Sequence, residues 1–311
     1  MLHNLSRREF LMFSGLLALD RDKRKQISAE IQKQDSVSFE EALADVSLRQ
    51  KYIDELVTEN SSPYVEEVIY DNDKSKAFEL AVKMSIAEAS LDYHIMHHDN
   101  KNIKPYDKVI ILHGLMRRMD NMPEVVNEAK KNASPEDFGL NEAAMGTLNF
   151  SDGYGLGFKS KMYVFNDSFT EWEIETPEFP IKIQPSEEIF KMHLSHEYKH
   201  AANGYKGLTI NDNLVVSHSD YQNISDEIAH FVEEGSAYLS GIEFSRQFGK
   251  NNSAYLLAVD MFDVFMTNEI AKLDMLKINT YEKELMAHYK LEFNKLTDEI
   301  KMVRIMLGQG I

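Results

Sequence analysis

The sequence contains no cysteine. Disulfide bonds, thiolate catalysis and cysteine-ligated zinc or iron–sulfur sites are therefore excluded, and any transition metal must be held by His, Asp and Glu side chains. Basic residues are in the minority, because 34 Lys and Arg oppose 51 Asp and Glu and leave a formal net charge of −17. This charge disfavours nucleic acid and anionic lipid as partners and favours neutral or cationic ones, such as peptide segments.

Long apolar runs are absent too. No stretch approaches the roughly 20 apolar residues of a membrane-spanning helix, so we expect no integral membrane association. Residues 6–11, Ser-Arg-Arg-Glu-Phe-Leu, are similar to a twin-arginine export signal, and an apolar run over residues 10–19 follows them. Because this run is short and no small-x-small cleavage site follows it, the sequence favours an N-terminal helix of a cytoplasmic protein, with export as the alternative.

The composition is that of a globular protein, since 43% of the 311 residues are hydrophobic and 27% are charged. Residue patterns in the first part of the chain predict helices over about residues 38–58 and 74–98. Shorter helices are expected to begin at Pro105 and Pro123, because proline is favoured in the first helical turn. We therefore expect a helical N-terminal lobe over residues 1–133.

The second part of the chain combines strands with helices. Alternating polar and apolar residues predict strands over residues 161–165 and 172–175, which would form a small antiparallel sheet. Capping residues and apolar periodicity predict helices over about residues 186–202 and 225–240, joined by a polar connection and followed by two longer helices. The sequence thus predicts an α+β, mainly α fold, with a second domain over residues 134–311.

One motif with a chemical meaning lies in this second part. The segment His196-Glu197-Tyr198-Lys199-His200 falls in a stretch that independently shows a helical pattern. Two imidazoles four residues apart project from one face of a helix, so both can bind a single Zn²⁺. Glu197, the next residue round the helix, can take a proton from a water at the open coordination position, whose pKa the metal lowers.

Two histidines need a third protein ligand. Glu234 lies on the next predicted helix and shares a face with small and apolar residues, which would let two helices approach closely. Its neighbour Glu233 is expected to point about a quarter-turn away. The preceding connection offers Asp212 and Asp220 as alternative ligands. A carboxylate at any of these places would complete a set of two histidines and one acid, with one position left for water.

The combination of His196-Glu197-x-x-His200 with a later Glu-Gly-x-Ala-Tyr sequence that begins at Glu234 resembles the gluzincin metallopeptidases. It is most similar to their peptidase-MA-like families. The resemblance covers about residues 160–242. It implies a zincin-like catalytic core with Zn²⁺ as cofactor, His196, His200 and Glu234 as its ligands, and Glu197 as general base.

The resemblance also implies how a substrate would bind. Zincin-like proteins present an edge strand above the metal, and the strand at residues 162–165 would take this role, with an ordinary sheet strand as the alternative. Side chains that could stabilise the oxyanion all follow the motif, namely His218, Tyr221, Tyr238, Tyr255 and His288. We interpret His193, one turn before His196, as a packed or surface histidine rather than a group that orients the metal site.

We therefore expect a zinc-dependent metallopeptidase that hydrolyses peptide bonds of a peptide or protein substrate through a metal-bound water activated by Glu197. The alternative is a catalytically inactive zincin-like binding or regulatory protein with a structural metal site. A fourth protein ligand, such as His218 or Asp220, would favour that alternative. A helical interaction protein in which the motif is accidental is the third interpretation.

Overall fold

The computed structural model describes residues 36–59, 62–97, 105–140, 143–148, 160–174, 180–210, 213–217, 224–273 and 279–306. Contacts divide the chain into two compact units, Met1–Glu59 and Asn60–Ile311. The twin-arginine-like segment lies outside the described residues. The boundary between these units differs from the one expected after residue 133. Residues 60–133 belong to the same unit as the helix that carries His196 and His200, and they contribute a strand to the three-stranded sheet of that unit.

The first unit consists, in its described residues, of α3 (Phe39–Ala44), the 3₁₀ turn η1 (Val46–Leu48) and α4 (Arg49–Glu59). Ser38 and Glu41 form a capping box, in which each side chain accepts a hydrogen bond from the backbone N–H of the other. The prediction of one continuous helix over residues 38–58 is wrong, because α3, η1 and α4 occupy this range. Asp45 adopts an extended backbone conformation, and its carboxylate accepts from the Ser47 N–H, so it ends one helix and caps the next turn.

The sheet of the second unit contains β1 (Val65–Tyr70), β2 (Met145–Leu148) and β3 (Ser160–Val164), in the spatial order β1-β3-β2. β2 runs antiparallel to β3, but β1 pairs with β3 in parallel. The prediction that this sheet is antiparallel is therefore wrong, because the sheet is mixed. The prediction of helices alone before residue 133 is also wrong, because β1 lies there. A parallel pair needs a crossover connection, and the helices that follow β1 provide it.

This crossover comprises α5 (Ser75–His97), α6 (Pro105–Met119) and α7 (Pro123–Lys131), with the 3₁₀ turn η2 (Pro135–Phe138) after them. All three helices confirm the sequence predictions, including the prolines at the first positions of α6 and α7. α5 packs on the sheet, since Ala77 joins Tyr163 and Phe165 in one buried cluster.

Two hairpins flank the motif helix, β4 (Trp172–Ile174) with β5 (Ile181–Ile183) and β6 (Leu208–Ile210) with β7 (Asn213–Val216). β3 and β4 confirm the two predicted strands, and the turn η3 (Asn166–Phe169) lies between them. The second hairpin falls within the stretch that was expected to be only a polar connection.

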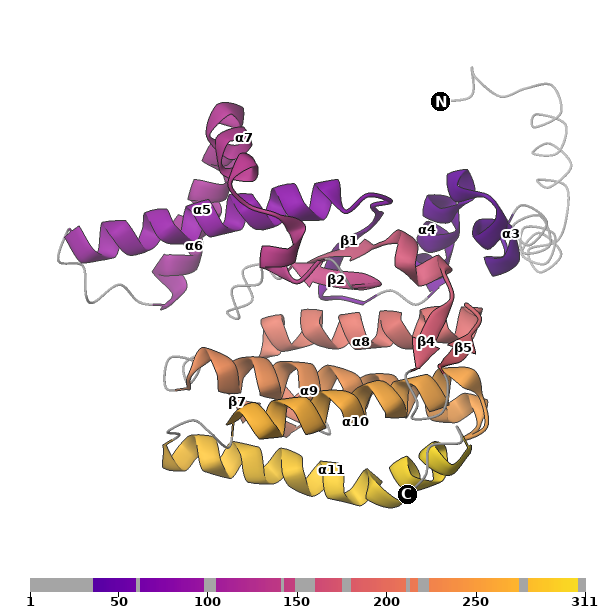
Figure 1. The fold of residues 1–311 in the computed structure, drawn as a ribbon. Helices are drawn as coiled ribbons and strands as arrows, with labels where there is room; N and C mark the ends of the chain where they lie inside the picture. Colours follow the sequence, from indigo (N-terminus) through magenta and orange to yellow (C-terminus); the bar gives the residue numbers. More distant parts are fainter. Residues whose placement is uncertain are drawn as a thin grey trace, which may run out of the picture. The chain divides into compact units, whose positions relative to one another are not determined.

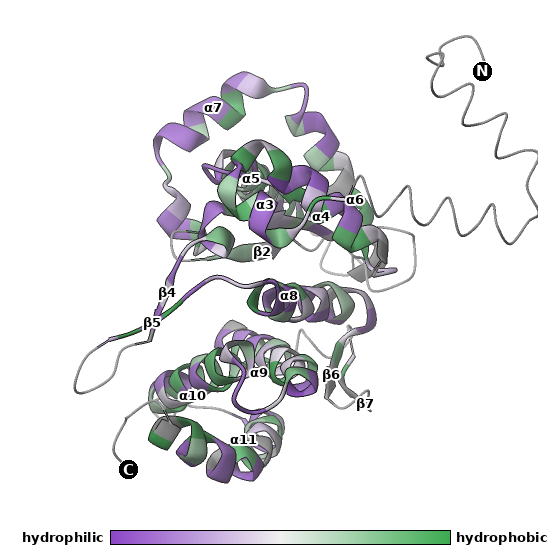
Figure 2. Cartoon of the chain, turned by 90° about the vertical axis from the view of Figure 1, so that its right-hand side faces the viewer, coloured by the Kyte–Doolittle hydropathy of each residue, from purple (hydrophilic) through white to green (hydrophobic). Residues whose placement is uncertain are grey.

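The C-terminal part is built from α8 (Glu187–Lys206), α9 (Asp226–Ser245), the turn η5 (Arg246–Phe248), α10 (Ser253–Leu273) and α11 (Thr280–Met306). Figure 1 shows α8 next to the sheet, then α9 and α10, with α11 outermost, and Figure 2 shows α8 between β2 and α9. Phe231, Tyr255, Phe262 and Tyr289 are fully buried in the core between these helices. The fold is α+β, mainly α, as expected, and no helix among the described residues combines the length and apolar character needed to cross a membrane.

Two helices are longer than their sequences indicated. α8 was expected to stop at Asn203, but the Asn203 side chain is buried and donates to the Ser236 hydroxyl of α9 at 2.7 Å, and the helix ends at Gly207, where φ is 88°. α9 was expected to end before Gly241. A Cβ there would lie 3.4 Å from Met192 Sδ, so this glycine permits the close approach of α9 to α8 and does not end the helix.

Candidate metal centre

The helix α8 carries both histidines of the motif. Ser186 caps it by accepting a hydrogen bond from the Ile189 N–H at 3.3 Å, and two glutamates occupy its first turn. His196 and His200 have ring centroids 4.9 Å apart and Nε2 atoms 3.1 Å apart. Their side chains are only 13% and 11% exposed. The helix therefore directs two nearly buried imidazoles toward one point, as the spacing predicted.

Glu234 reaches the same point from α9. Its Oε2 atom lies 3.6 Å from His196 Nε2, and its Oε1 atom lies 3.5 Å from His200 Nε2. The two helices are fixed in register by the Asn203–Ser236 hydrogen bond and by close hydroxyl contacts between Ser195 and Ser240. The structure thus brings together the three groups that the sequence resemblance implied as ligands.

The spacing of these donor atoms fits a small cation. Four ligands held tetrahedrally at about 2.0–2.1 Å from a zinc ion lie roughly 3.3–3.4 Å from one another. The separations among the two Nε2 atoms and the Glu234 oxygens are 3.1, 3.5 and 3.6 Å, which bracket that distance. Imidazole nitrogen and carboxylate oxygen are also ligand types that zinc accepts. The residues present therefore fit Zn²⁺.

Glu197 lies beside this point and is held from another direction. Ligand-type atoms of His196, Glu197 and His200 all lie within 4.8 Å of one another. Glu197 is 8% exposed, and its Oε2 atom accepts a hydrogen bond from the Thr147 hydroxyl of β2 at 2.7 Å. The two acids thus approach the histidines differently, since Glu234 has an oxygen close to each imidazole while Glu197 is also bound to β2.

A second acid of α9 contacts the site. Glu233 Oε1 lies 3.5 Å from His200 Nδ1, the ring nitrogen that faces away from His196. The expectation that Glu233 points away from the site is wrong, because the His200 ring projects between the side chains of Glu233 and Glu234. A carboxylate at the second nitrogen fixes the tautomer and the orientation of a ligating imidazole.

The charges of the site stabilise one another. Burial disfavours the protonated imidazole of His200, but the carboxylates of Glu233 and Glu234 outweigh burial and raise the pKa of His200 well above its usual value. Burial likewise disfavours ionised Glu234, but hydrogen bonds from His196 and His200 hold the pKa of Glu234 well below its usual range. Glu234 is therefore ionised at neutral pH and can offer its negative charge to a cation.

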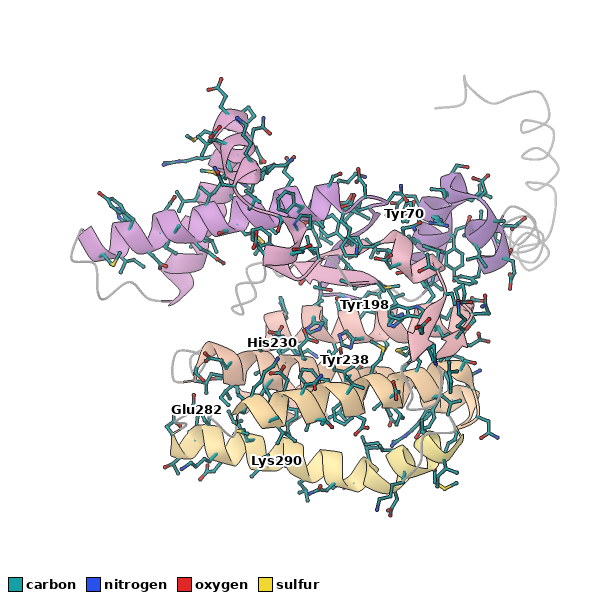
Figure 3. All side chains as sticks on the ribbon, in the orientation of Figure 1. Tyr70, Tyr198, His230, Tyr238, Glu282 and Lys290 are labelled. Atoms are coloured by element: carbon teal, nitrogen blue, oxygen red, sulfur yellow. The ribbon has the colours of Figure 1, made fainter. Side chains whose placement is uncertain are left out.

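A cavity of about 630 Å³ includes the site, within the size range of small-ligand pockets. Its walls come from α5, α8, α9, α10, the strands β2, β3 and β4, and the segment before β2. Tyr238 of α9, labelled in Figure 3, lines this cavity, and its ring centroid lies 4.6 Å from that of His196. Burial and the charges of Glu234 and Glu197 raise the pKa of Tyr238, so its hydroxyl stays protonated.

Of the other sequence candidates with described side chains, Tyr255 and His193 are not among the groups that converge on the two imidazoles. Tyr255 is buried in the helical core and donates to Glu299. His193 packs against Trp172 with ring centroids 4.8 Å apart, and burial with the nearby His196 lowers the pKa of His193 to about 3, which agrees with a neutral packed histidine. Outside the described residues or side chains lie Asp212, His218, Asp220, Tyr221 and the side chain of His288.

The strand β2 contributes three successive residues to the lining of the cavity. The main chain of β3 is paired with β1 on one side and β2 on the other, so the expected role of residues 162–165 as an edge strand is wrong. Among the described residues β2 forms one edge of the sheet and β1 the other, and Met145, Gly146 and Thr147 of β2 line the cavity. Sequence gave no signal for this strand or for Thr147, which lies 50 residues before Glu197.

The chain matches no protein-family model, and no curated protein or solved structure is significantly similar to it.

Proposed function

We propose that this chain is a zinc-dependent metallopeptidase of the gluzincin type. The proposal is supported chiefly by the convergence of His196 and His200 from one helix and Glu234 from another, at donor spacings that fit zinc. The buried carboxylate of Glu197 lies beside them. A zinc ion bound there would polarise the scissile carbonyl and lower the pKa of a water molecule.

The side chains of the cavity have complementary roles in this proposal. Glu197 accepts a proton from the attacking water as the water oxygen bonds to the carbonyl carbon, and returns it to the amide nitrogen as the C–N bond breaks. The protonated hydroxyl of Tyr238 donates to the oxyanion. An extended peptide adds to β2, an edge strand among the described residues, by main-chain hydrogen bonds, with its carbonyl near Glu197.

The substitution Glu197→Gln separates metal binding from hydrolysis. The amide cannot accept the proton, so we expect the variant to keep about one zinc per chain and to lose on the order of 10²–10⁴-fold in kcat. Zinc content by mass spectrometry and hydrolysis of a quenched-fluorescence peptide library measure the two effects. Glu187→Gln, a change of an exposed acid in the first turn of α8, is the matched control and should leave both unchanged.

Two outcomes would contradict the assignment. Equal turnover by Glu197→Gln would remove Glu197 as the base, and full zinc occupancy in His196→Ala would remove the metal site.

A catalytically inactive protein with a structural metal site is the second candidate function. The observation that favours it is the proximity of Glu197 to both imidazoles, which could make Glu197 a fourth protein ligand and close the site. The same variant decides between the two functions. Loss of zinc in Glu197→Gln, with no hydrolysis by the wild-type protein, would support the structural site.

A further inference from the structure

The proposed base Glu197 is tied to the edge strand by a single side chain. The Thr147 hydroxyl lies 2.7 Å from Glu197 Oε2 and 3.2 Å from the Glu197 backbone carbonyl oxygen. Both acceptors belong to one residue, so the hydroxyl docks β2 onto α8 at the position of the base. A buried carboxylate needs such a donor, because a charge left without a partner in the interior is strongly destabilised.

Because of this hydrogen bond, the two oxygens of the Glu197 carboxylate have different roles in the proposal. Oε2 accepts from the Thr147 hydroxyl, and in this proposal Oε1 receives the proton from water. A carboxylate held at one oxygen cannot rotate freely, and the geometry of proton transfer depends on such positioning. The strand that supplies the donor also borders the cavity with its neighbours Met145 and Gly146.

We propose that Thr147 is a positioning residue for peptide hydrolysis, whose hydroxyl orients the Glu197 carboxylate and sets the place of the edge strand against the motif helix. This inference rests on the proposed function. It assigns Thr147 no contact with the metal, and it predicts that the threonine hydroxyl serves the chemical step and not substrate binding.

The test compares Thr147→Val with Thr147→Ser. Valine keeps the shape and strand preference of threonine but lacks the hydroxyl, so we expect kcat to fall about 10–100-fold while KM changes little. Serine restores the hydroxyl and should regain most of the lost kcat. Zinc content should stay at about one per chain in both variants. Thr170→Val, the same change at an exposed threonine outside the cavity, controls for the substitution itself.

Each remaining outcome overturns the proposal. A kcat for Thr147→Val equal to that of the wild type would show that the hydroxyl does not position the base. Loss of zinc together with activity, or failure of serine to rescue, would show a purely structural role. A wild-type protein that is fully loaded with zinc and hydrolyses no peptide would overturn the proposed function as well, and is thereby distinguished from failure of this inference alone.

Discussion

The adjacent acids Glu233 and Glu234 on α9 contact the histidines of α8 at different ring nitrogens. Glu234 faces the Nε2 atoms of both histidines, whereas Glu233 faces only the opposite nitrogen of His200. In the proposed function, Glu234 would bind the metal and Glu233 would orient the ligand His200. Neighbouring residues on a helix point in directions about 100° apart. This rule alone does not show which histidine nitrogen each of the two glutamates faces.

We expect Glu233→Gln to weaken zinc binding about 10–100-fold, because the neutral amide orients and polarises His200 less well than a carboxylate. Competition with a chelator of known affinity measures the dissociation constant. Glu227→Gln, at an exposed position near the start of α9, should leave the constant unchanged. A Glu233→Gln protein that binds zinc as tightly as the wild type would show that the 3.5 Å contact has no role in the site.

At the scale of elements, the N-terminal end of α9, the helix that carries Glu233 and Glu234, is anchored to α11. Its first residues are tied to α11 by Glu282, labelled in Figure 3, which accepts from the Ser225 N–H at 2.7 Å and from the Asn279 N–H at 2.8 Å. Burial disfavours the charged carboxylate, but these backbone hydrogen bonds outweigh it and lower the pKa of Glu282. One ionised side chain therefore holds the N-terminal ends of two helices together.

This arrangement predicts a dependence of stability on pH. Because the pKa of Glu282 is lower in the folded protein than the value of 4.5 for a free glutamate, its contribution is complete above pH 4.5 and is lost as the pH falls through the folded-state pKa. Glu282→Gln should lower the free energy of unfolding by on the order of 1–3 kcal/mol at pH 7. The difference from the wild type should shrink below pH 4.5, as measured by urea denaturation.

Other carboxylates also titrate in this range, so the comparison needs a matched variant. Glu284→Gln changes an exposed acid two residues further along α11 and should alter the free energy of unfolding little at either pH. If Glu282→Gln lowers the free energy of unfolding by the same amount at pH 7 and in acid, the ionised carboxylate is not the cause of the loss.

At the scale of the whole molecule, the candidate site belongs to one unit. Every residue that lines the cavity lies between Ala77 and Met261, within the unit Asn60–Ile311. The helices α5, α8, α9 and α10 and the strands β2, β3 and β4, which supply lining residues, belong to this unit as well. Among the described residues, the lining of the cavity thus comes from the unit Asn60–Ile311.

We expect a fragment of residues 60–311 to fold and to retain zinc binding. Zinc at about 100 times its dissociation constant should stabilise the fragment by about 2.7 kcal/mol, seen as a rise in Tm that a chelator reverses. The double variant His196→Ala, His200→Ala should show no such rise. A folded fragment that binds no zinc, beside a full-length chain that does, would show that the site needs the first unit.

The sequence predicted those features that depend on neighbouring residues. The capping box at Ser38, the proline starts of α6 and α7, and the period of α8 are local, and each was found where its pattern indicated. The errors arose where packing outweighs local preference. Asn203 and Gly241 look like helix ends, yet one donates across the α8–α9 interface and the other lets the helices approach.

By itself, then, the sequence determined the fold class and the placement of two imidazoles on one face of a helix, because a helical period fixes side chains four residues apart. Only the tertiary structure decided which acid faces both imidazoles and which edge strand borders the cavity. It also decided that the Thr147 hydroxyl donates a hydrogen bond to Glu197. These partners are separated by 34 to 50 residues along the chain, and contacts over such distances depend on how whole elements pack.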